Sequence, residues 1–134
     1  MGLVQQLLEI LSRNIGGFQL QYQIICCFWL MSFSCASELL KFGVTVATCD
    51  VLRETEKQKV SRVCLALFRN LLDRASESSS RAIAAAMISC KIQKSLEVLE
   101  EKALDDCEME EDLQVVHSKL QDVEQSLSSY EEYW

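Results

Sequence analysis

The side chains in this 134-residue sequence that could do chemistry are seven cysteines, one histidine and a cluster of carboxylates. A thiol–imidazole pair would have to join Cys107 to His117, which lie ten residues apart. Cys107 stands inside the acidic stretch DDCEMEED, where the surrounding negative charge disfavours the reactive thiolate. We find no other nucleophile next to a base, so the sequence predicts no catalytic residue and no enzyme activity.

The acidic run at residues 105–112 could in principle bind a hard cation. It lacks the ordered ligand spacing and the central glycine of a calcium loop. The sequence also has no CxxC pair, a single histidine and no glycine-rich phosphate loop. We therefore predict no metal and no cofactor. The run is interpreted as a solvated linker and a helix start, where the carboxylates complement the helix dipole.

The seven cysteines are odd in number, and most of them fall within apolar helical runs. This pattern is typical of reduced thiols that act as small core residues in a cytosolic protein. We therefore expect all of them to be unpaired in the cytosol: Cys26, Cys27, Cys35, Cys49, Cys64, Cys90 and Cys107.

The composition favours an all-α protein with one domain over residues 1–134. Hydrophobic residues make up 49% and charged residues 25%, and there is no proline and only four glycines.

Residues 97–134 carry 13 acidic and 2 basic side chains, whereas residues 1–96 carry 7 acidic and 11 basic ones. The acidic end does not suit nucleic acid. The most apolar run, residues 24–33, is shorter than the roughly 20 residues of a membrane span, so we predict a core helix and no membrane insertion.

The helix expected at residues 56–74 organises the rest of the chain. Its apolar side chains recur at spacings of three and four residues: Val60, Val63, Cys64, Leu67, Phe68, Leu71 and Leu72. The other side of this helix is largely polar. We predict that it binds a partner through Lys59, Arg62, Arg69 and Asn70. The alternative is an ordinary solvated face. Arg62 and Arg69 are both expected to be exposed, and the competing surface for a partner is the acidic run at residues 105–112.

Further amphipathic patterns predict helices along the remaining chain: residues 2–12, 18–34, 35–42, 44–53, 81–91, 92–102 and 108–127. The helix at 18–34 is apolar over most of its circumference, so we expect it to be covered on several sides. A polar loop is expected at residues 75–80, with Ser79 or Ser80 as the cap of the following helix.

The helices recur at a regular interval. Gly2 aligns with Gly43 at an offset of 41, Leu30 with Phe68 at 38, and Val44 with Ile92 at 48. Units of about 40–47 residues that contain two or three helices are typical of HEAT and armadillo solenoids. We predict an armadillo/HEAT-like right-handed α-solenoid of about two and a half repeats, incomplete on its N-terminal side and capped by the acidic helix at 108–127. An αα-bundle with accidental spacing is the alternative.

Several segments together resemble one family, the regulatory H-type subunits of the vacuolar-type proton-pumping ATPase (V-ATPase). They run in family order: QLQYQIICCFWLMSF (19–33), EKQKVSRVCLALFRNLLDRASE (56–77), AAAMISCKIQKSLEVLEEKALDDCEMEEDLQ (84–114) and LQDVEQSLSSYEEY (120–133). The chain resembles the later part of the family's N-terminal helical-repeat domain. The earlier repeats and the C-terminal domain are expected to be missing, as in a fragment, a short splice form or an incomplete gene model.

The resemblance implies a non-catalytic regulatory subunit of the soluble, ATP-hydrolysing sector of the pump. Such a subunit binds the peripheral stalk, helps couple ATP hydrolysis to proton transport and is cytoplasmic, on the cytosolic face of acidifying endomembranes. Other subunits of the soluble sector are its implied partners. The alternative function is that of a generic armadillo-type adaptor, which binds an extended acidic peptide or protein.

Overall fold

A computed structural model describes residues 2–13, 17–102 and 107–132, and within these ranges it leaves the side chains of Lys102 and residues 127–132 undescribed. The described ranges contain helices and no strand. The helices are α1 (Leu3–Arg13), α2 (Gly17–Lys41), α3 (Val44–Glu54), α4 (Gln58–Arg74), α5 (Glu77–Ser89), α6 (Gln93–Lys102) and α7 (Cys107–Glu132). The predicted all-helical class is confirmed.

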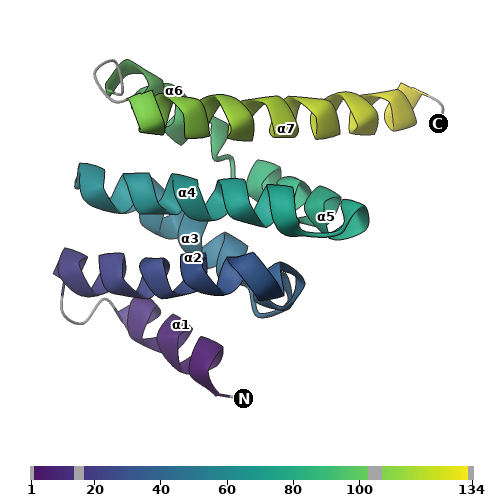
Figure 1. The fold of residues 1–134 in the computed structure, drawn as a ribbon. Coiled ribbons are helices and arrows are strands. Elements are labelled where there is room, and N and C mark those ends of the chain that lie inside the picture. The colour runs from purple at the N-terminus through teal and green to yellow at the C-terminus, as the bar shows by residue number, and fades with distance from the viewer. Residues whose placement is uncertain (1, 14–16, 103–106, 133–134) are drawn as a thin grey trace.

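The three longest helices lie side by side, with α4 between α2 and α7 (Figure 1). The shorter α3 and α5 lie behind them in this view, and α6 packs against α7. This arrangement is consistent with an α-solenoid. The handedness and the number of repeats stay predictions.

Helix α4 provides much of the core, as its sequence pattern predicts. The side chains of Leu67, Phe68 and Leu71 are fully buried, and all seven apolar residues of the predicted stripe are buried. The helix begins at Gln58, two residues later than the pattern suggests. The backbone N–H of Lys57 donates to Oγ1 of Thr55 at 3.2 Å, so a short turn precedes the helix.

Helix α2 joins the two helices that the sequence predicts at 18–34 and 35–42. The predicted boundary between these two helices is a local kink in α2, because Cys35 has non-helical backbone angles (φ −137°, ψ 44°). Its thiol donates to the carbonyl of Met31 at 3.0 Å, and Ser32 bonds the carbonyl of Trp29. Side chains that bond the preceding turn in this way compete with the backbone and bend helices. Gly43 follows α2 in the left-handed region (φ 81°), as expected for this glycine.

The expectation that α2 is covered on several sides is met only in part within the described chain. The helix packs on α4, α3, α1 and α5, and Ile24, Ile25 and Phe28 are buried. Leu30 is nevertheless 62% exposed and Phe33 is 41% exposed, so one side of the helix stays open. By length and composition α2 could also cross a membrane, as core helices and signal sequences can. Its buried residues, among them Ile25 and Phe28, face the neighbouring helices.

The boundaries of α5, α6 and α7 differ from the prediction, most of all at the start of α5 and the end of α7. Ser76, rather than Ser79 or Ser80, caps α5, and its hydroxyl accepts from the N–H of Ser79 at 3.3 Å. The loop is therefore shorter than the predicted 75–80, and the Ser80 hydroxyl instead donates to the carbonyl of Leu72 at 2.8 Å. Helix α7 extends beyond the predicted 108–127, and it buries Met109, Leu113, Val116 and Leu120. The side chain of Leu127 lies outside the described residues.

Candidate partner-binding groove

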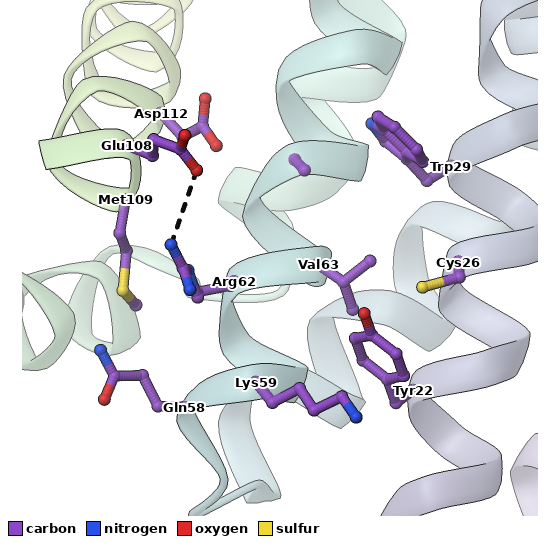
Figure 2. Close-up of a pocket in the computed structure, with 11 residues that line it drawn as sticks. Tyr22, Cys26, Trp29, Gln58, Lys59, Arg62, Val63, Glu108, Met109 and Asp112 are labelled. Atoms are coloured by element: carbon purple, nitrogen blue, oxygen red, sulfur yellow. Dashed lines mark ion pairs between the residues drawn. The ribbon is translucent and has the colours of Figure 1, made fainter. Parts of the chain in front are cut away.

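A groove of about 680 Å³ runs between α2, α4 and α7. Helix α2 contributes Tyr22, Cys26 and Trp29 to its lining. The α4 side includes Lys59, Arg62 and Ala66, and the α7 side includes Glu108, Met109 and Asp112 (Figure 2). A second hollow of about 660 Å³ shares Trp29, Ala66 and Asp112 with the first and adds Arg69, Asn70, Asp73 and Arg74. All four residues of the predicted partner-binding face therefore line this groove or the hollow that continues it.

Lys59 of α4 and Tyr22 of α2 meet at the groove. The ammonium nitrogen of Lys59 lies 4.2 Å from the centre of the Tyr22 ring, a cation–π contact that joins α4 to α2. Figure 2 shows the lysine reaching toward this ring. A hydrogen bond with Cys26 raises the pKa of Tyr22 above its usual value.

Arg62 and Arg69 point to the acidic start of α7. The Nη2 atom of Arg62 lies 3.5 Å from Oε2 of Glu108, and Nη1 of Arg69 lies 2.8 Å from Oδ1 of Asp112. Arg69 also approaches Glu111 at 3.7 Å and Asp73 at 3.8 Å. The hydrogen bond with Asp112, more than the other nearby carboxylates, raises the pKa of Arg69.

These ion pairs correct one expectation from the sequence. The sequence predicts that the basic face of α4 and the acidic run compete for a partner, but the described part of the run faces α4 and pairs with it. Asp105 and Asp106 lie outside the described residues. The side chain of Arg69 is 33% exposed and has three carboxylates nearby, so it is less available to a partner than the sequence suggests.

Asn70 carries a buried polar atom. Its Nδ2 nitrogen is shielded from solvent and has no hydrogen-bond partner within the described part of the chain. A buried donor without a partner costs about 1–3 kcal/mol. Asn70 also lines the hollow shared with Trp29 and Arg69, so its side chain would have to turn before this amide could donate to a carbonyl in the groove.

The side chains that the sequence offers for catalysis and metal binding do not form a site. His117 of α7 has its Nε2 atom 2.8 Å from Oε1 of Glu100 of α6. No group of three or more metal-ligating side chains comes together within residues 2–13, 17–102 and 107–132.

Sequence reasoning missed the aromatic side of the groove. Trp29 packs edge-on against Phe33, with ring centres 5.2 Å apart, and the guanidinium of Arg74 lies 4.5 Å above Phe33. The apolar pattern of α2 predicts core positions for its aromatic residues, because the helix is apolar nearly all round. The signal that could have found this side is a pair of basic residues on α4, because Lys59 lies over the Tyr22 ring and Arg74 lies over the Phe33 ring.

The chain matches one family of known proteins along most of its length. A family model that describes the H-type subunit of the V-ATPase matches residues 1–120. The H-type subunit of the V-type proton ATPase of Drosophila melanogaster is 38% identical over 97% of this chain and 28% of that protein. The second of two probable H-type subunits of the V-type proton ATPase of Caenorhabditis elegans is 37% identical over 98% of this chain and 28% of that protein. The chain thus spans less than a third of the length of these relatives, and it belongs to the family of V-ATPase H-type subunits.

Proposed function

We propose that this chain acts as a non-catalytic regulatory subunit, or part of one, in the soluble ATP-hydrolysing sector of the V-ATPase. It binds the peripheral stalk and helps couple ATP hydrolysis to proton transport. The observation that carries this proposal is the match to the H-type subunits along nearly the whole chain. The location that follows is cytoplasmic, at the cytosolic face of acidifying endomembranes.

The groove between α2, α4 and α7 is the proposed contact surface for the stalk. Lys59 and Arg62 are exposed at its α4 side, and Arg69 and Asn70 lie deeper. Carboxylates of α7 line the opposite side, including Glu108 and Asp112. A partner that places acidic side chains along α4 would meet complementary charge, which mainly raises the association rate and weakens with salt.

Capture of partners from cell extract tests this function. The purified chain should recover peripheral-stalk subunits of the proton pump at low ionic strength. Changing Lys59 to Glu should weaken the recovery about tenfold, whereas changing the exposed Arg81 of α5 to Glu should leave it unchanged. Arg81 is the matched control, because both changes reverse one exposed cation on a helix. Equal recovery with both variants would contradict the assignment of the groove.

A second candidate function has support from Asn70. An adaptor that binds an extended acidic peptide would hold it along the hollow that Asn70 lines, where the Asn70 amide could donate to the peptide backbone once the side chain turns its shielded Nδ2 atom outward. The same capture experiment distinguishes the two functions. Recovery of other cargo through Lys59, without stalk subunits, would favour the adaptor.

A further inference from the structure

A thiol lies in a cationic hollow that shares no lining residue with the partner-binding groove. This hollow of about 540 Å³ lies where α3 meets the end of α5 and the start of α6. Its lining consists of Arg53, Ser89, Cys90, Lys91, Lys94, Ser95 and Val98. Three of these residues are cations and none is a carboxylate. Asp50 stands just outside the lining, with its Oδ1 atom 3.3 Å from Nη1 of Arg53.

The backbone fixes Cys90 in this position. Cys90 ends α5, and the next residue, Lys91, has a left-handed backbone (φ 57°) that turns the chain toward α6. The Nη2 atom of Arg53 donates to the carbonyl of Cys90 at 2.9 Å. The end of α3 is therefore tied directly to the residue that carries the half-buried thiol.

A second thiol lies behind the first. Cys49 stands one helical turn before Arg53 on α3 and is 1% exposed. Burial in the core, followed by the neighbouring Cys90 thiol and its hydrogen bond, raises the pKa of Cys49. Both cysteines are free thiols in this structure. Cys90 is thus open to the hollow on one side and adjoins Cys49 on the other.

We propose that Cys90 and Cys49 form a thiol pair that reacts with an anionic low-molecular-weight disulfide of the glutathione type, with Cys90 as the entry site. The cations of the hollow attract the carboxylates of the disulfide. The Cys90 thiolate attacks one sulfur of glutathione disulfide, which forms a mixed disulfide and releases one glutathione thiolate. The sulfur of Cys49 then attacks the sulfur of Cys90, and the departing glutathione thiolate takes up the Cys49 proton.

The second step forms the Cys49–Cys90 disulfide and releases the second glutathione. Two protein thiols are oxidised and one glutathione disulfide is reduced to two glutathione molecules, so the electrons balance. Burial still disfavours ionisation of Cys49, so the second step should be slower than the first. The product links α3 to the end of α5, two helices that already contact each other. Neither step depends on the proposed function.

The reduced 134-residue chain provides its own control, because Cys107 is an exposed thiol next to Glu108 and Glu110. With glutathione disulfide at low ionic strength, peptide mass spectrometry should find Cys90 modified about tenfold faster than Cys107. The neutral 2-hydroxyethyl disulfide should reduce this preference, and so should the double change Lys91→Asn and Lys94→Gln. Asparagine is chosen because it tolerates the left-handed backbone.

Replacing Cys49 by Ala separates the two steps. The wild-type chain should proceed to the internal Cys49–Cys90 disulfide, whereas the Cys49→Ala chain should accumulate glutathione on Cys90. The matched control is Cys64→Ala, which removes another fully buried thiol and should behave as the wild type. Circular dichroism checks that each variant is folded. Cys90 reacting no faster than Cys107, or a mixed disulfide that persists equally in wild type and Cys49→Ala, would overturn the proposal.

Discussion

Helices α2 and α4 are both long and rich in apolar residues, yet they differ in how much of their surface the rest of the chain covers. Helix α4 lies between α2 and α7, and its apolar stripe is buried. Helix α2 buries Phe28 toward its neighbours but leaves Leu30 and Phe33 exposed. Hydrophobicity alone therefore does not locate the core. Both helices contact four others, so the sides on which those neighbours lie, rather than their number, decide which apolar residues are buried.

The largest expected effect contrasts one leucine from each helix. Leu71→Ala in α4 should lower the free energy of unfolding by about 2–5 kcal/mol, because it removes a fully buried side chain and leaves a cavity. Leu30→Ala in α2 makes the same chemical change at a 62% exposed site and should cost within about 0.5 kcal/mol. Chemical denaturation measures both. Equal losses would mean that the two helices are equally covered.

The periodicity of the sequence is sufficient to predict the buried side of α4. Leu67 and Leu71 lie in an uninterrupted pattern of threes and fours, so their burial follows from helix geometry. The same reasoning fails for Leu30, because a helix that is apolar all round gives no direction to its core. The ion pairs of Arg69 with α7 are also missed, since a periodic pattern does not say which distant helices become neighbours.

A smaller effect is expected at the contact between α4 and α7. Arg69→Glu would place a carboxylate beside Asp73, Glu111 and Asp112, so we expect a loss of about 1–2 kcal/mol, since each partly exposed pair contributes up to about 1 kcal/mol. The loss should shrink in high salt. Such a result would show that Arg69 is held by neighbouring carboxylates, whereas the sequence suggests a freely exposed cation.

Arg62→Glu is the matched control for this contact. Arg62 is 48% exposed and lies 3.5 Å from Glu108, whose side chain is 89% exposed, so its change should cost less than that of Arg69. Thermal unfolding at two salt concentrations measures the difference. A larger loss for Arg62 than for Arg69 would show that the acidic start of α7 packs on a different part of α4.

The smallest effect is expected where α4 gives way to α5. Ser76→Ala should cost about 1 kcal/mol, because the Ser76 hydroxyl accepts the N–H of Ser79 at the start of α5. Ser79→Ala, at a position that the sequence favours for the cap, should cost less than about 0.5 kcal/mol. The serines of this segment look alike in sequence, and the end of α4 at Arg74 decides which one caps. If Ser79→Ala lowered the free energy of unfolding more than Ser76→Ala, the cap would be Ser79, as the sequence favours.

Site-specific photo-cross-linking in the assembled proton pump tests most directly whether the groove between α2, α4 and α7 contacts the peripheral stalk. A photoreactive residue replaces the exposed Lys59 at the groove or, as the control, the exposed Arg81 outside it. We predict cross-links from position 59 to peripheral-stalk subunits and none from position 81. Cross-links to the stalk from position 81 alone would contradict the groove as the contact surface.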